Sequence, residues 1–307
     1  MAAALGCLLM AFVQTAAQDV EERLRRTREF MGTGHLDRAE KEILRAVEAA
    51  PQNAEVRRLL CEMRRVQGRR EDAVLACRKA VDLAPARSDY MIALGDLLVQ
   101  REDGVDEAIR AYRRAVEVDV TNPRPYIRLG SIYERQGRMQ DAEAEYREAL
   151  ALNPNLVQAN AGLGAVLFIT GRLVEARRFL GRAIELRPRD LRSHIFLGLA
   201  LNHDGQIDLA LQELRTAIGI DPHAANAAAG VQDQRPRFEK LREVFAAQLE
   251  ANPRDSSVLY NLGVVAYYLR DYEAAWRHII KAQQFGYPVD MGLKEVVYAR
   301  WRRLSDR

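Results

Sequence analysis

The stretch LGSIYERQGRMQDAEAEYREALALNP, residues 129–154, holds a spacing of small and apolar residues that the chain repeats. Leucine and glycine open the motif, a second glycine and then alanines and a large apolar residue follow, and a proline closes it. The matching positions are Leu129, Gly130, Gly137, Ala142, Tyr146, Ala149 and Pro154; then Leu163, Gly164, Gly171, Ala176, Leu180, Ala183 and Pro188; and then Leu197, Gly198, Gly205, Ala210, Leu214, Ala217 and Pro222. A fixed period of this length indicates a stack of small structural units rather than one globular core.

Each unit is predicted to consist of two helices. Apolar residues recur at helical spacing between residues 125 and 135, and again between residues 140 and 152. Gly137 separates the two stretches, and its lack of a side chain suits the end of a helix. Pro154 ends the second stretch, because proline disfavours helix in the residue before it. The small residues of the motif let two antiparallel helices pack at the close end of ~8–10 Å. The sequence therefore predicts an all-α fold.

This pattern resembles the tetratricopeptide repeat family, whose signature is W-x2-L-G-x2-Y…A-x3-F…P with a 34-residue period. Tyr126, Asn160 and His194 stand where the signature has tryptophan. The resemblance implies a right-handed superhelical solenoid of antiparallel helix pairs. It also implies that the first helix of each pair lines a concave face, which in this family commonly takes an extended peptide or a partner helix.

The repeats define the expected domain organisation. The chain is predicted to hold a signal peptide at 1–17, tetratricopeptide repeats one to six at 18–223, a degenerate repeat or linker plus a helix at 224–253, a last full repeat at 254–288 and a capping helix at 289–307. The cap is expected because a solenoid needs a terminal element with a polar outer face. Because the repeats follow one another along the chain, one continuous superhelix is expected. Residues 224–236 lack apolar periodicity, so a point of flexibility is expected near Gly230.

The first seventeen residues suggest export to the periplasm or the extracellular space. Residues 1–18 carry no charged side chain, residues 2–13 have the length of the apolar part of a signal peptide, and Ala17 suits cleavage by signal peptidase. A basic residue before this run is missing. The alternative is an apolar first helix of the array, in a cytoplasmic protein. The run is short and alanine-rich for a membrane span, so no stable span is expected in the mature chain.

Two cysteines fall within one helix pair. Cys61 and Cys77 take interior positions at which a small apolar residue is expected. Buried free thiols are the expected state, and a disulfide formed after export is the alternative.

No pattern in the sequence predicts catalysis, a cofactor or a metal site. HExxH, CxxC and phosphate-binding motifs are absent. His194 and His203 lie about two and a half turns apart on one helix, so they cannot share a metal. The 46 basic and 43 acidic residues are interspersed and leave a net charge of +3, which argues against a nucleic-acid-binding stripe. We expect a protein that is not an enzyme and does not bind nucleic acid.

The resemblance places the candidate site on the first helices of the repeats. Near the N-terminus their groove faces are charged, with Glu55, Arg58, Glu62, Arg65, Asp89, Ile92, Asp96 and Gln100. The predicted partner-binding residues are Arg124, Ile127, Arg135, Phe168, Ile169, Arg192, Ile195, Leu199, Tyr260, Val264, Tyr267 and Tyr268. Exposed apolar patches mark interaction sites, and aromatic anchors dominate binding energy. The alternative is that the neighbouring unit, or the segment 224–236, covers these side chains.

The sequence thus predicts a non-catalytic scaffold or adaptor that binds protein or peptide partners in its concave groove, in the cell envelope. Apolar and aromatic anchors would hold the partner, and Arg124, Arg135 and Arg192 would select acidic or polar sequences. The alternative is an accessory or regulatory subunit of a separate enzyme such as a glycosyltransferase. The catalytic partner is then expected to be another polypeptide. Self-association through the end units is a further possibility.

Overall fold

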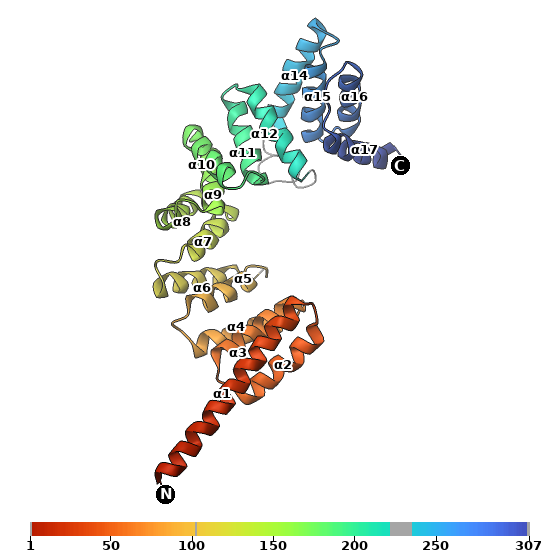
Figure 1. Ribbon diagram of the computed structural model, residues 1–307. Helices are drawn as coiled ribbons and strands as arrows, with labels where there is room; N and C mark the ends of the chain where they lie inside the picture. The colour runs from red at the N-terminus through yellow and green to blue at the C-terminus, as the bar shows by residue number, and fades with distance from the viewer. Residues whose placement is uncertain (1, 102, 222–234, 306–307) are drawn as a thin grey trace. The chain divides into compact units, whose positions relative to one another are not determined.

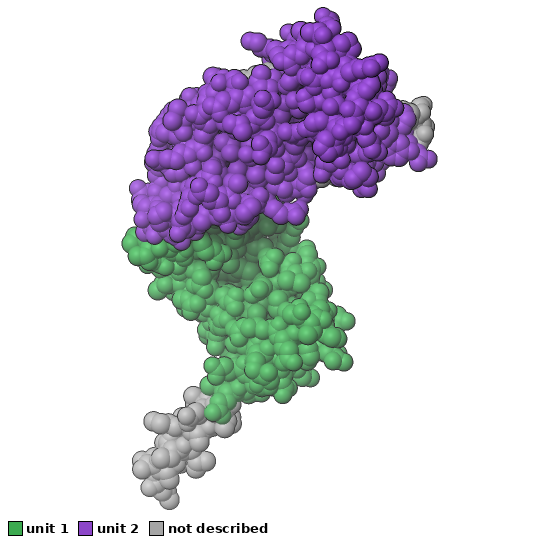
Figure 2. Space-filling view, turned by 45° about the horizontal axis from the view of Figure 1, so that its top comes forward, with its two compact units in different colours: residues 1–136 green, residues 137–307 purple. Residues whose placement is uncertain are grey.

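The computed structural model describes residues 2–101, 103–221 and 235–305, without the side chains of residues 2–16, 237, 304 and 305 (Figure 1). All regular secondary structure in these ranges is α-helical. The chain divides into two compact units, residues 1–136 and 137–307 (Figure 2). The sequence did not predict this division. The expected point of flexibility at Gly230 and most of the segment 224–236 lie outside the described residues.

Unit 1 contains seven helices in its described part. They are α1 Ala2–Gly32, α2 Leu36–Ala49, α3 Ala54–Val66, α4 Arg70–Leu83, α5 Ser88–Leu98, α6 Val105–Val118 and α7 Pro123–Arg135. The closest packing occurs within the consecutive antiparallel pairs α1/α2, α3/α4 and α5/α6, and each pair also contacts the next. The predicted all-α array of helix pairs is therefore confirmed.

Unit 2 also consists of helices packed in consecutive pairs, and in Figure 1 the helix after α12 is labelled α14. Its described helices are α8 Met139–Leu152, α9 Val157–Ile169, α10 Leu173–Leu186, α11 Leu191–His203, α12 Ile207–Ile220, α14 Arg235–Ala251, α15 Ser256–Tyr268, α16 Tyr272–Gln284 and α17 Met291–Ser305. The pairs α9/α10, α11/α12 and α15/α16 pack most closely, and α17 contacts α16 and α12. The predicted capping segment is thus a helix packed on the last full pair.

At the N-terminus, α1 runs without a break from Ala2 to Gly32. Val20 and Leu24 of α1 are buried in an apolar core with residues of α2 and α3. The structure does not test cleavage after Ala17, so the signal peptide stays a prediction. Among the described residues, no helix has the length and apolar character needed to cross a membrane.

Within four of the described helix pairs, α5/α6, α9/α10, α11/α12 and α15/α16, a glycine faces one large apolar side chain. A Cβ atom added at Gly164 would lie 2.6 Å from Leu180, and one added at Gly263 would lie 2.5 Å from Ile279. Both distances are shorter than van der Waals contact, so any larger residue would push the helices apart. Overpacking of this kind costs about 1–3 kcal/mol. This contact explains why glycine recurs at a mid-helix position, where it is otherwise unfavourable.

One pair replaces this contact with a covalent bond. Cys61 of α3 and Cys77 of α4 form a disulfide across 16 residues, with their Cα atoms 5.2 Å apart. The expectation of free thiols was wrong. The physical reason is that the two cysteines occupy the same small–large contact as Gly164 and Leu180, where the helices approach most closely. Two thiols placed there are within bonding reach.

Among the described residues, one residue other than glycine takes a left-handed backbone conformation in a turn between paired helices. Gly171 and Gly205 end their helices at φ +81° and +74°, in the left-handed region. In the last full repeat, Arg270 takes the equivalent position at φ 62°. A residue with a Cβ is strained there by roughly 1–2 kcal/mol.

We expect Arg270→Gly to raise the free energy of unfolding by about 0.5–1 kcal/mol, because glycine relieves the strain at the cost of some unfolded-state entropy. Gly205→Arg, the reverse change in the neighbouring turn, should lower it by at least as much. Urea unfolding of both variants measures this. A destabilised Arg270→Gly protein would show that the turn is held by something other than backbone conformation.

We expect reduction of the disulfide to lower the stability of unit 1 by roughly 3 kcal/mol, the loop-closure value for a loop of this length. The matched control is Cys61→Gly/Cys77→Leu, which recreates the glycine–leucine contact of other repeats without a cross-link. Thermal melts with and without dithiothreitol should differ for the wild type and coincide for this variant. A wild-type melt that ignores the reductant would contradict the assignment.

Candidate functional site

A cavity of about 670 Å³ lies in unit 1, on the first helices of three successive repeats. Its walls come from α3, α5 and α7, and α6 adds one tyrosine. The lining residues are Arg58, Cys61, Glu62, Arg65, Asp89, Ala93, Asp96, Leu97, Val99, Gln100, Tyr112, Arg124, Arg128, Ser131, Ile132 and Arg135. The site is a charged surface with a small apolar floor. Its volume is within the usual range for ligand pockets, about 300–1,000 Å³.

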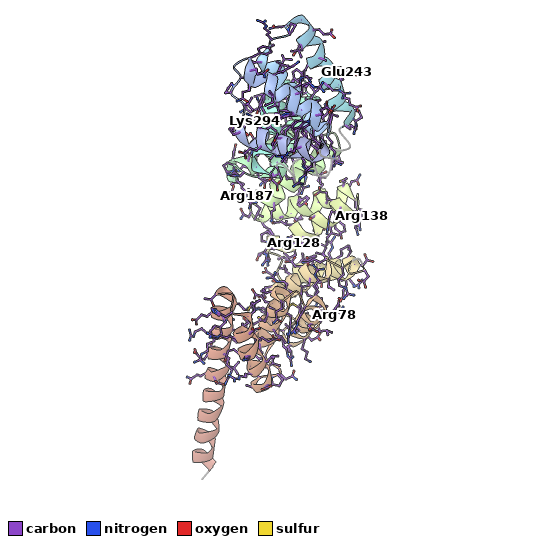
Figure 3. The ribbon with its side chains drawn as sticks, turned by 90° about the vertical axis from the view of Figure 1, so that its right-hand side faces the viewer. Arg78, Arg128, Arg138, Arg187, Glu243 and Lys294 are labelled. Carbon is purple, nitrogen blue, oxygen red and sulfur yellow. A yellow bond between two sulfur atoms is a disulfide. The ribbon has the colours of Figure 1, made fainter. Side chains whose placement is uncertain are left out.

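The helical period explains which residues reach this cavity. On α7, Arg124, Arg128, Ser131 and Arg135 are spaced by four, three and four residues, so they form one stripe along the helix. Asp89, Ala93, Asp96 and Gln100 make the equivalent stripe at the start of the neighbouring repeat, with Gln100 just beyond the end of α5. Arg128 is labelled in Figure 3.

Asp96 is the centre of one polar network in the cavity. It accepts a hydrogen bond from the Tyr112 hydroxyl at 2.7 Å and forms an ion pair with Arg128 at 2.8 Å. Burial, together with the hydrogen bond to the Asp96 carboxylate, raises the pKa of Tyr112 above its usual range. The network fixes the three side chains of α5, α6 and α7 relative to one another.

Glu55 is the centre of a second network beside the cavity. It pairs with Arg58 at 2.8 Å and with Arg28 at 2.6 Å, and it accepts a hydrogen bond from the Tyr90 hydroxyl at 2.8 Å. Burial alone would raise the pKa of Glu55, but the hydrogen bonds from Arg58, Tyr90 and Arg28 lower it to about 2. Arg58 also contacts Glu62 at 3.1 Å. Helices α1, α3 and α5 are tied together by this carboxylate.

Three arginines of the cavity have no such partner. Among the described residues, the side chains of Arg65, Arg124 and Arg135 form no ion pair or hydrogen bond. The cavity's own carboxylates are already paired: Glu62 with Arg58, Asp89 with Arg87, and Asp96 with Arg128. The site therefore presents positive charge that the described part of the protein does not neutralise.

The predicted apolar anchors lie elsewhere and are buried. Seven of them are packed inside the protein: Ile127, Ile195, Leu199, Tyr260, Val264, Tyr267 and Tyr268. Phe168 is also buried, at 7% exposed, whereas Ile169 is 47% exposed. The prediction that these residues form an exposed apolar groove was wrong for all except Ile169. Arg124 and Arg135 are exposed, and Arg192 is half-buried with its guanidinium 5.7 Å from the Phe196 ring centroid.

The physical reason for this burial is close packing between successive repeats. The Phe168 ring of α9 meets the Phe196 ring of α11 edge to face, with centroids 5.7 Å apart. The Tyr260 ring stacks on Tyr287 at 4.6 Å, and the buried Tyr268 hydroxyl donates to the Leu214 carbonyl at 2.8 Å. The alternative interpretation, in which a neighbouring unit covers these side chains, is observed for Phe168 and Tyr268, whereas Tyr260 is covered within its own repeat.

Sequence reasoning missed several members of the cavity. Arg128 and Ala93 line it, whereas their neighbours Ile127 and Ile92 were assigned to the groove and are buried. The assigned face was displaced by one residue at this position. The helical period could have identified Arg128, because residues four apart lie on the same face of a helix and Arg128 is four residues after Arg124.

The geometry defines a helical-repeat protein, and comparison with family models identifies the repeat. Two models described as tetratricopeptide repeat match the chain, one at residues 24–88 and 92–157 and the other at 134–199, and together they cover more than half of it. The chain belongs to the tetratricopeptide repeat family. No curated protein matches it.

Solved structures agree on the fold. PilF of Pseudomonas aeruginosa is 16% identical with a TM-score of 0.61, covering 68% of this chain and 94% of its own. PilW, described as a type IV pilus biogenesis factor, is 17% identical with a TM-score of 0.58 over 66% of this chain and 94% of its own. A tetratricopeptide repeat protein of Parabacteroides merdae is 17% identical with a TM-score of 0.56 over 93% and 98%. At these identities the likeness concerns the fold alone.

We expect the Glu55 network to make unit 1 sensitive to acid. The pKa of Glu55 is about 2 in the folded protein and 4.5 ordinarily, so its stabilising contribution is complete above pH 4.5 and is lost as the pH falls toward 2. Glu55→Gln should therefore be less stable than wild type at pH 7 and should lose less stability on acidification. Urea unfolding at several pH values measures both effects. Glu48→Gln, at an exposed position on α2, is the control. Equal acid sensitivity of wild type and Glu55→Gln would contradict the assignment.

Proposed function

We propose that this protein is a non-catalytic scaffold that holds a partner protein on the first helices of unit 1. The observation that carries the proposal is the cavity between α3, α5 and α7, in which ion pairs and a disulfide hold several lining residues, among them Arg58, Asp96 and Cys61. A surface held in one conformation before binding loses less entropy when a partner docks. Membership of the tetratricopeptide repeat family supports protein partners, because this family's first helices commonly bind peptides.

The proposed site differs from the one expected from sequence. The candidate in the C-terminal half required exposed aromatic anchors, and Tyr260, Tyr267 and Tyr268 are buried. The cavity in unit 1 instead offers charged groups above a small apolar floor of Ala93 and Ile132. Binding there would depend on charge and shape more than on apolar anchors.

We also propose that the protein works outside the cytoplasm, in the cell envelope. Two observations support this: the apolar, uncharged run at residues 1–17 and the disulfide between Cys61 and Cys77. Disulfides persist mainly in exported proteins, since the cytosol keeps thiols reduced. PilW, one of the similar structures, is described as a type IV pilus biogenesis factor, and its likeness to this chain concerns the fold.

Site-specific photo-cross-linking in the native host tests the scaffold proposal. Benzoylphenylalanine placed at Ser131, on the cavity, should capture a defined partner protein. The same cross-linker at Arg114, an exposed position on α6 that does not line the cavity, should not capture it. Identical cross-link patterns from both positions would show that this face is not the binding site.

A further inference from the structure

We infer that the cavity of unit 1 binds an acidic, extended segment of its partner protein, whose carboxylates pair with Arg65, Arg124 and Arg135. This inference rests on the proposed function, because it assigns the chemistry of the partner at the same site. It follows from the charges and the spacing of the lining residues.

The charged residues that line the cavity suit an acidic ligand. Each carboxylate that lines the cavity forms an ion pair within the protein, with Arg58, Arg87 or Arg128 as its partner. The remaining guanidiniums, Arg65 and Arg124 and Arg135, are unpaired among the described residues. Unpaired exposed arginines are common on surfaces, but these three line one concave site. The lining holds five arginines and three acids, so it has an excess of positive charge. A cleft with such an excess attracts ligands of the opposite sign, and arginine binds carboxylates through two parallel hydrogen bonds.

The shape of the lining suits an extended segment. A short extended chain is narrow and can lie along the α7 stripe of Arg124, Arg128, Ser131 and Arg135. Its backbone can then approach Ala93 and Ser131, whose short side chains leave room.

The spacing of the arginines argues against one small anion. Arg124 and Arg135 are eleven residues apart on α7, so their Cα atoms lie about 16 Å apart along the helix. Arg65 is on α3, and helix α5 lies between α3 and α7 in the sequence of the array. An extended chain covers about 16 Å in about five residues, and alternate side chains point the same way. Acidic residues at alternate positions of a short segment therefore match the arginines on α7.

The lining also favours a polypeptide over a nucleic acid. Proteins that bind single-stranded nucleic acid without sequence preference combine positive charge with aromatic rings on which bases stack. Tyr112 is the aromatic member of this lining, and its hydroxyl is bonded to Asp96. A single aromatic residue engaged in this way does not provide the stacking surface that successive bases need.

Fluorescence anisotropy with defined peptides tests the inference. The probe is a fluorescein-labelled peptide of sequence Gly-Ser-Glu-Ala-Glu-Ala-Glu-Ser-Gly, and the matched probes carry glutamine or lysine in place of each glutamate. We expect the glutamate peptide to bind at least about tenfold more tightly than the glutamine peptide, and more weakly as salt screens the charges. The lysine peptide should not bind. Equal binding of the glutamate and glutamine peptides would overturn the inference.

Matched variants locate the binding. Arg124→Gln/Arg135→Gln should weaken the glutamate peptide at least about tenfold, since each charge-assisted pair contributes measurably. Arg110→Gln/Arg114→Gln removes the same charge from exposed positions of α6 and should leave the dissociation constant within about twofold. Circular dichroism checks that both variants fold. Equal weakening by the two pairs would show non-specific attraction and overturn the inference.

Two further outcomes separate this inference from the proposed function. If Arg65→Gln/Arg124→Gln/Arg135→Gln still cross-links the same partner from Ser131 with wild-type yield, the scaffold proposal stands and the acidic-segment inference fails. If labelled oligothymidylate binds as tightly as the glutamate peptide and is lost in the same variants, the site prefers a polyanion of another class, and the inference is overturned. Loss of the partner cross-link in the triple variant, with no oligothymidylate binding, supports the inference.

Discussion

The close approach of two helices at a single small residue is the constraint on which the rest of this array depends. Gly198 lies against Leu214 so tightly that an added Cβ would fall 2.8 Å from the leucine side chain. The two helices are held at this distance, and the alanines nearby are completely buried. Each pair then has a fixed thickness, and the next pair packs onto a surface of known shape. A solenoid needs this uniformity because its stability is a sum of repeats and of contacts between neighbours.

Ion pairs between repeats follow from that uniform spacing but contribute less to stability. Arg78 pairs with Glu107 at 2.7 Å and Arg101 with Glu71 at 2.8 Å, each across about 30 residues. In unit 2, Arg172 reaches Glu143 at 2.6 Å. All are partly exposed, and exposed pairs contribute about 0–1 kcal/mol each. The apolar layers therefore stabilise the stack, while the charged residues determine what its surfaces can bind.

The sequence predicted the fold well because a few local residues of each repeat determine where its helices end and where the two helices of the pair touch. It predicted poorly which side chains of the first helices are exposed, because their exposure depends on the distance between repeats. Leu199 and Phe196 belong to the inner stripe of α11, yet both are buried, with Phe196 packed on Phe168 of the preceding repeat. No single repeat reveals this contact. The equivalent stripe of α7 consists of arginines and a serine, which resist burial, and it remains open.

The disulfide lies directly beside the cavity of unit 1. Cys61 is both a member of the cavity lining and half of the cross-link that joins α3 to α4. Helix α3 carries Arg58 and Arg65 on its inner face, so the bond limits movement of one wall of the proposed site. In α5/α6, α9/α10, α11/α12 and α15/α16 a glycine and a large apolar residue maintain the helix distance by packing alone. In α3/α4 the disulfide does the same, so this wall of the cavity is held by a covalent bond as well as by packing.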